Sequence, residues 1–170
     1  MKPKSESNGT RPLPAPNCAG KRFAVIAARF YRELTDSMID GAKRALADCG
    51  VSEEDILVYD VPGCFELPLA CRKIINRDGV DGVVALGVVI RGETTHFDFV
   101  AGQCAQGIMN VQLATSVPIG FGVLTTENME QAQERADPKQ GDKGYEAAMA
   151  AASLVALDHQ HELPRAGFRS

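Results

Sequence analysis

The residues most able to do chemistry lie together in residues 87–98, which read GVVIRGETTHFD. An apolar, strand-like run crosses Gly92, passes the adjacent hydroxyls of Thr94 and Thr95, and ends on His96 at the expected start of a helix. Helix N-termini bind anions, because unpaired N–H groups and the positive end of the helix dipole point outward there. Histidine can move protons near neutral pH. A histidine at a helix start can also serve only as a cap, but the neighbouring hydroxyls and glycine favour an anion site with a proton-transfer group.

The elements that must position this stretch alternate along the chain. Short apolar runs of strand length are each followed by a pattern typical of a helix. The expected strands are residues 23–28, 56–61, 82–89 and 117–124. The expected helices follow: one through Met38 to Cys49, one from Pro68 to Gly79, one from near His96 to Ala114, one capped by Thr125 and Thr126 and ending near Arg135, and one from Lys143 to about Leu157 capped by Asp142. This alternation predicts a parallel sheet between layers of helices.

In parallel sheets of this kind, ligands bind beyond the carboxyl ends of the strands. The residues expected there are Arg29 and Phe30, the run Gly63, Cys64, Phe65 and Glu66, residues 91–96, and Thr125 and Thr126, with Phe121 late in the fourth strand. They would supply aromatic rings for a flat ligand, a carboxylate for hydroxyl groups, hydroxyls for an anion, and one histidine. The pattern predicts a polyfunctional small-molecule pocket.

Several of these residues also have purely structural explanations. Glu66 could be a favourable charge in the first turn of a helix, the phenylalanines could belong to the core, and Arg135 could simply complement a helix C-terminus. The turn after the first expected strand reads ARFYRE, so it has neither a glycine-rich dinucleotide fingerprint nor a P-loop. We therefore expect no nucleotide cofactor. His159 and His161 have no third ligand nearby in the sequence, so we expect no metal.

Composition indicates a single globular domain. Of 170 residues, 45% are hydrophobic and 24% are charged, and the net charge of −4 argues against a general nucleic-acid or anionic-membrane binder. Five cysteines without a CxxC spacing are expected to be reduced thiols in a cytoplasmic protein. The expected organisation is an extended or disordered arm (residues 1–21) with four prolines before residue 21, an α/β domain (22–157) and a flexible tail (158–170).

Four segments together carry a specific resemblance: GVVIRGETTHFDFV, VPGCFELP, FGVLTTENMEQAQERA, and GDKG before the last helix. In unbroken order over about residues 22–157, the chain resembles the 6,7-dimethyl-8-ribityllumazine synthases of riboflavin biosynthesis. The resemblance implies a flavodoxin-like three-layer α/β/α sandwich with a four-stranded parallel sheet. It also implies a transferase that needs no cofactor.

The resemblance assigns a role to each matching position. His96 falls on the catalytic histidine, and Phe30 on the aromatic that stacks against the pyrimidine. The remaining substrate-binding positions are Cys64, Phe65 and Glu66 for the ribityl chain, Val88, Val89 and Ile90 for the uracil edge, Glu93, Thr94, Thr95 and Arg135 for the phosphate, Lys143 close by, and Phe121, which matches an aromatic from the adjacent subunit. Because an acidic side chain would repel phosphate, we expect Glu93 to contribute through its main chain.

The reaction implied joins 5-amino-6-(D-ribitylamino)uracil and 3,4-dihydroxy-2-butanone 4-phosphate, the expected small-molecule partners. The resemblance also implies a homo-oligomer, a pentamer or an assembly of pentamers such as an icosahedral shell, with sites shared between subunits. A non-catalytic flavin- or lumazine-binding or shell protein of the same fold is the alternative; loss of His96 or Arg135 would be its signature, and both are present. A flavodoxin-like signalling module would need an acidic cluster at the strand ends, which this chain lacks.

Overall fold

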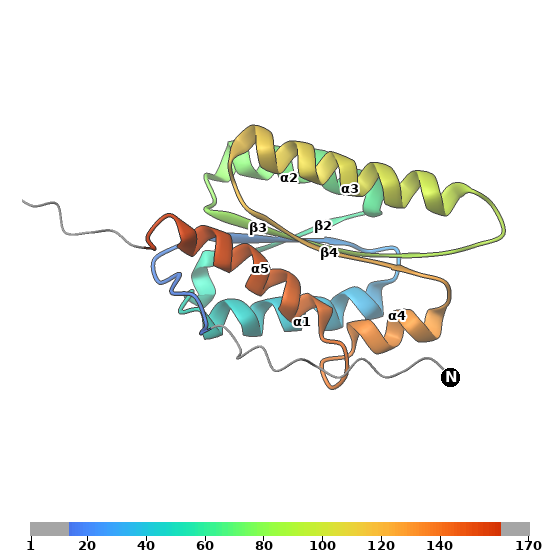
Figure 1. Ribbon diagram of the computed structural model, residues 1–170, viewed down its shortest axis with the longest axis horizontal. Helices are drawn as coiled ribbons and strands as arrows, with labels where there is room; N and C mark the ends of the chain where they lie inside the picture. Colours follow the sequence, from blue (N-terminus) through green and yellow to red (C-terminus); the bar gives the residue numbers. More distant parts are fainter. Residues whose placement is uncertain (1–13, 161–170) are drawn as a thin grey trace, which may run out of the picture.

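The computed structural model describes residues 14–160 (Figure 1). Most of the expected arm and tail, residues 1–13 and 161–170, lie outside the described residues. The elements run in the order β1 (Phe23–Ala28), α1 (Arg32–Asp48), β2 (Ile56–Val61), α2 (Leu67–Asp78), β3 (Gly82–Ile90), α3 (His96–Thr115), β4 (Ile119–Thr126), α4 (Met129–Ala136) and α5 (Lys143–Leu157), with short 3₁₀ helices at Glu53–Asp55 and Cys64–Glu66. The predicted β-α alternation is confirmed.

The strands form a four-stranded sheet in the order β2-β1-β3-β4, and each neighbouring pair is parallel. The chain moves outward from β1 to β2 on one side, and from β3 to β4 on the other. The order therefore reverses between β1 and β3, which creates a crevice at their carboxyl ends. Pairing of β3 with β1 stops at Leu86, whereas pairing of β3 with β4 continues to Ile90. The β1-facing edge of residues 88–90 thus lies beyond the ladder, at the crevice.

Helices cover both faces of the sheet, as the three-layer prediction requires (Figure 1). α2 and α3 lie on one face, where Leu67, Cys71 and Cys104 pack against the sheet. α1, α4 and α5 lie on the other face, with Met38 and Leu46 among the buried residues. β1 is buried along its whole length and β3 over Gly82–Val88. Continuous apolar strands are the expected signature of a sheet covered on both sides.

α1 and α5 approach each other closely because glycines lie at their contact. A Cβ built on Gly144 would lie only 2.1 Å from the carbonyl oxygen of Met38, and one on Gly41 would lie 2.9 Å from the backbone nitrogen of Tyr145. The alanines of α5 continue this tight packing, since Ala148, Ala151 and Ala152 are fully buried. The alanine-rich pattern of the last helix is thus explained by helix-helix contact.

The fourth strand differs from its predicted position. β4 spans Ile119–Thr126 rather than residues 117–124, so Phe121 is near the start of the strand and not late in it. Thr125 and Thr126 belong to the strand and do not cap α4. The N-cap is Asn128, whose side-chain oxygen accepts a hydrogen bond of 2.9 Å from the backbone N–H of Gln131. Asparagine is a stronger N-cap than threonine, which accounts for the later helix start.

The residue before α5 also behaves differently from its predicted role. Asp142 is the N-cap, but its side chain makes no capping hydrogen bond. Its carboxylate instead accepts two hydrogen bonds from the Arg44 guanidinium, at 2.8 and 3.0 Å. Asp142 has a left-handed backbone conformation, with φ 45° and ψ 45°. The ion pair therefore connects α1 to the turn that leads into α5.

Part of the segment before β1 packs against the domain. Cys18 is fully buried, and its backbone N–H donates a hydrogen bond of 2.8 Å to the carbonyl of Cys49. Arm residues from 14 onward thus lie against the domain at this point. The expected thiol state is confirmed, because all five cysteines are unpaired and buried. Within residues 14–160, no helix is long and apolar enough to cross a membrane.

Candidate active site

A cavity of about 550 Å³ lies at the crevice between the carboxyl ends of β1 and β3, on the side of α2 and α3. It brings together eight of the predicted site residues, His96 among them, from four separate segments of the chain. The lining residues are Phe30, Tyr31, Gly63, Cys64, Phe65, Glu66, Val88, Val89, Ile90, His96, Phe99 and Val100. The cavity therefore lies where the strand order predicts a ligand site.

Each wall of the cavity is presented by the end of an element. Phe30 follows β1 and points its ring outward, with 76% of the residue exposed. The 3₁₀ helix after β2 supplies Phe65 and Glu66, both exposed at the opening. Aromatic rings of this kind can stack on a flat heterocycle. The Glu66 carboxylate can accept hydrogen bonds from ligand hydroxyls.

The last residues of β3 form the floor of the cavity. Residues 88–90 extend past the ladder with β1, so alternate backbone N–H and C=O groups on that edge face the crevice. The side chains of this strand end are apolar. A planar ligand placed here would be bound through the main chain, which can read the polar edge of a ring.

His96 lies at the rim, on the first residue of α3, and is exposed. Its backbone N–H donates to the hydroxyl oxygen of Thr94 at 3.4 Å. Thr95 is the N-cap, but its side chain makes no capping hydrogen bond. The helix therefore starts without a strong side-chain cap, which suits a position where a bound anion would satisfy the first-turn N–H groups.

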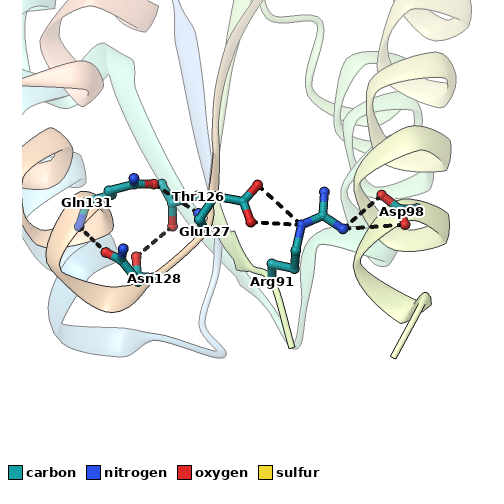
Figure 2. A network of polar contacts seen from close by, with 6 residues as sticks. All are labelled: Arg91, Asp98, Thr126, Glu127, Asn128 and Gln131. Carbon is teal, nitrogen blue, oxygen red and sulfur yellow. Dashed lines mark hydrogen bonds and ion pairs between the residues drawn. The ribbon is translucent and has the colours of Figure 1, made fainter. Parts of the chain in front are cut away.

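Arg91 holds the segment that leads from β3 to His96 (Figure 2). Its backbone N–H donates to the carbonyl of Thr126 at 2.8 Å. Its side chain lies between the Glu127 carboxylate, at 3.0 Å from Nε, and the Asp98 carboxylate, at 3.3 Å from Nη1. The guanidinium also lies 4.2 Å from the centre of the Phe97 ring. These contacts tie the first turn of α3 to the end of β4.

A second layer of hydrogen bonds supports Glu127 (Figure 2). Its backbone N–H donates to the side-chain oxygen of Gln131 at 2.9 Å, and Gln131 in turn bonds the Asn128 cap. The Thr126 hydroxyl donates to the Asn128 carbonyl at 3.0 Å. The start of α4 and the start of α3 are thus connected through Arg91.

Cys64 contributes a thiol to the wall of the first cavity. The residue is 5% exposed, and its Sγ lies 3.8 Å from the carbonyl oxygen of Val88. Burial raises the pKa of this thiol to about 11. The thiol is therefore protonated at neutral pH and is a poor nucleophile. It fills the wall of the cavity.

A second cavity, of about 450 Å³, lies along β4 on the side of α4 and α5. It contains three of the six predicted site residues that are missing from the first cavity: Phe121, Arg135 and Lys143. The Arg135 Nη1 donates to the carbonyl of Gln131 at 3.2 Å, and Lys143 forms an ion pair of 2.7 Å with Glu146. Phe121 is 46% exposed at the same opening. The two cavities share no lining residue, so the structure does not bring Arg135 to His96 within one chain.

The remaining predicted residues, Glu93, Thr94 and Thr95, are exposed in the segment before α3 and line neither cavity. The structure also brings Gly63, which the sequence placed at the end of the second strand, into the first cavity. The sequence reasoning missed three residues of this cavity: Tyr31, Phe99 and Val100. Phe99 could have been found, because it lies three residues after His96 and so shares a helix face with it. It also missed Glu146 in the second cavity, for which the sequence offers no signal beyond its spacing from Lys143.

Comparison with known proteins identifies the family. The family model described as 6,7-dimethyl-8-ribityllumazine synthase matches residues 20–159. The chain is 48% identical over 157 residues to the 6,7-dimethyl-8-ribityllumazine synthase of Thermus thermophilus, covering 92% of this chain and 96% of the relative. It is likewise 48% identical over 139 residues to the protein of that name from Chlorobium limicola, covering 82% of this chain and 90% of the relative.

Proposed function

The chain belongs to the 6,7-dimethyl-8-ribityllumazine synthase family, and we propose that the cavity beside His96 is where it forms the lumazine product. The reaction condenses 5-amino-6-(D-ribitylamino)uracil with 3,4-dihydroxy-2-butanone 4-phosphate. The observation that carries this assignment is the meeting of Phe30, Glu66, His96 and the open edge of residues 88–90 around one cavity. A ring, a polyol chain and a proton-transfer step each have a matching group there.

The pyrimidine substrate fits the cavity by its parts. Its ring would stack on Phe30, and its polar edge would bond the main chain of residues 88–90. Its ribityl chain would run past Cys64 and Phe65, with hydroxyls donating to Glu66. These contacts hold the reacting amine in place, and such positioning supplies much of the rate enhancement in condensations of two substrates.

We assign the proton transfers of the reaction to His96. The 5-amino group attacks the ketone, and loss of a water molecule gives an imine. A proton is then removed and inorganic phosphate leaves, after which the ribitylamino nitrogen closes the ring and a second water molecule departs. His96 would carry the protons of these steps, a role typically worth about 10²–10⁴-fold in rate.

The phosphate would lie at the start of α3, bonded by Thr94, Thr95 and the main chain of Glu93. A cationic partner would complete the site. Arg135 and Lys143 have the right charge, but they line the other cavity of the same chain. We therefore propose that a neighbouring copy supplies Arg135, Lys143 and Phe121, so that the working protein is a homo-oligomer with shared sites. A pentamer, or an assembly of pentamers, is the state that we expect.

The proposal extends to the organisation and location of the protein. We propose that residues 22–157 form the catalytic domain, with an arm before it and a tail after it. We also propose a cytoplasmic location. The five buried, unpaired cysteines support it, because oxidising compartments favour disulfides.

The test is to mix the purified protein with both substrates. Formation of the lumazine, followed by its absorbance and fluorescence, should accompany release of one inorganic phosphate per product. Omitting either substrate should abolish both signals. A protein that binds the lumazine but gives no phosphate release would instead be the non-catalytic binding or shell protein.

A further inference from the structure

Arg29 is the residue between β1 and Phe30, and its side chain is held from several sides. The guanidinium is only 11% exposed. Nη1 donates to the Thr35 hydroxyl at 3.0 Å, and Nη2 lies 2.5 Å from the Asp36 carboxylate. Nε lies 3.6 Å from the Asp60 carboxylate and, among residues 14–160, is the one buried side-chain nitrogen or oxygen without a hydrogen bond.

These contacts join three elements. Thr35 and Asp36 lie in the first turns of α1, and Asp60 lies next to the last residue of β2. The backbone N–H of Arg29 also donates to the Val61 carbonyl, at 2.9 Å. Beyond Val61 the chain turns directly into the 3₁₀ helix Cys64–Glu66, which is the second wall of the cavity. Arg29 therefore connects the element ends that carry the two facing walls.

Phe30 depends on this anchoring more than a core residue would. It is 76% exposed, and its ring contacts that of Tyr31 edge-on, with centroids 5.0 Å apart. The following turn is bonded through Thr35, whose hydroxyl lies 3.2 Å from the Tyr31 carbonyl and 3.1 Å from that of Arg32. Thr35 is fully buried and shares its hydroxyl with Arg29. The backbone on both sides of Phe30 is thus fixed by one buried polar cluster.

Arg29 does not reach the ligand itself. It lines neither the first cavity nor the second. Its donors are engaged by α1 and faced by Asp60, so an effect of Arg29 on substrate must pass through the walls that it holds. A mobile Phe30 would lose entropy on stacking against a ring, and a preorganised one would not.

We propose that Arg29 is a positioning residue that, through its contacts with Thr35, Asp36 and Asp60, fixes Phe30 against the facing Cys64–Glu66 wall and so sets the affinity for the flat heteroaromatic substrate. This inference rests on the proposed function. It differs from a purely structural role, because it assigns the effect to one of the two substrates and to one aromatic ring.

The experiment is two-substrate kinetics on Arg29→Lys, which keeps the charge but loses the planar fork of donors. We expect the KM for the ribitylaminouracil to rise about five- to tenfold, the size of effect that an aromatic stack supports. The KM for the butanone phosphate, measured at saturating pyrimidine, should stay within about twofold, and kcat should change less than the pyrimidine KM.

A double-mutant cycle separates positioning from general destabilisation. In a Phe30→Ala background, Arg29→Lys should change the pyrimidine KM by less than about 1.5-fold, because the ring through which it acts is gone. Fully additive effects would overturn the proposal. If Arg29→Lys does not fold, Asp60→Asn and Thr35→Val remove single partners and should raise the same KM.

Arg22→Lys is the matched control. Arg22 lies just before the first residue of β1 and pairs with Asp55 at 3.5 Å, so its replacement perturbs an ion pair at the opposite end of the strand from Arg29. Its kinetics should equal those of the unsubstituted protein. Equal pyrimidine KM values for Arg29→Lys and Arg22→Lys would refute the positioning role alone. Absence of turnover in the unsubstituted protein would instead refute the proposed function, and the inference with it.

Discussion

At the scale of single residues, the cavity combines groups that each do little alone. His96 is exposed and lies on the first turn of a helix, where histidines often serve only structure. The role proposed for His96 depends on the other groups that line the same cavity: the Phe30 ring, the Glu66 carboxylate and the main-chain edge of residues 88–90.

We expect His96→Ala to lower kcat by about 10²–10⁴-fold, because proton transfer loses its positioned group. Binding of the lumazine product should weaken much less, since stacking and main-chain contacts remain. Stopped-flow absorbance gives the first quantity and fluorescence titration the second. His159→Ala, a histidine replacement beyond the end of α5, is the control and should retain full turnover. An unchanged kcat in His96→Ala would refute the assignment.

The sequence was most informative for residues just past the strand ends. Phe30, Glu66 and His96 could be predicted because parallel strands bring their carboxyl ends to one edge, whatever the details of packing. Phe121 was misplaced within its strand, since the apolar run from Val117 to Leu124 gives no signal for where pairing begins. Arg29 and Arg91 were not recognised as anchors, because their partners come from distant parts of the chain.

At the scale of elements, helix positions depended on caps and close contacts. The start of α3 at His96 agrees with the prediction from the sequence. α4 begins later than predicted, because its N-cap is Asn128 rather than Thr125 or Thr126. Periodicity could predict that α5 is a helix. It could not predict that Asp142 would bond Arg44 rather than cap the helix, because that choice depends on where α1 lies.

The contact between α1 and α5 leads to a stability prediction. In Gly144→Ala the added methyl would lie 2.1 Å from the Met38 carbonyl oxygen, so the helices must move apart. We expect a loss of about 1–3 kcal/mol in the free energy of unfolding. Urea denaturation at fixed protein concentration measures it.

Gly102→Ala is the matched helical control for this prediction. A Cβ at Gly102 meets no atom within 4 Å, so alanine should be neutral or stabilising by up to about 1 kcal/mol through its higher helix propensity. Equal stabilities of the two variants would contradict the close-packing explanation of α5.

At the scale of the whole molecule, buried thiols make stability depend on pH. Burial raises the pKa of Cys71 to about 12, from an ordinary value of 9.0. The unfolded chain therefore loses this proton at lower pH than the native protein. The contribution of this pKa difference to the free energy of unfolding is complete below pH 9 and is lost as the pH rises toward 12.

For Cys71→Ala we expect the unfolding free energy to fall less steeply above pH 9, by about 1.4 kcal/mol per pH unit. Urea denaturation at several pH values between 8 and 10.5 measures the slope. Ile74→Ala, on the same helix, removes buried volume without a titrating group. It should lower stability by a constant amount, leaving the slope parallel to that of the unsubstituted protein.

Sharing of sites between copies can be tested by mixing two defective variants. His96→Ala lacks the proton carrier, and Arg135→Ala should raise the KM for the butanone phosphate most. When the two are unfolded together and reassembled in equal amounts, random assortment should restore about a quarter of the sites. Turnover of the mixture above the average of the separate variants is the expected result. No gain in mixtures shown by native mass spectrometry to contain both would contradict shared sites.

The first cavity is lined from the α3 side of the sheet and the second from the side of α4 and α5, which constrains the geometry of any such assembly. The two cavities share no lining residue, so an interface that joins the His96 cavity of one copy to the Arg135 cavity of the next would use two different sets of residues. Under the proposed sharing of sites, copies would join head to tail. In an open chain of copies, the His96 cavity at one end and the Arg135 cavity at the other end would lack a partner. In a closed ring, every cavity would have one. Closure of the ring would thus complete every active site. Each copy would supply residues to one neighbour's site and receive residues from the other neighbour.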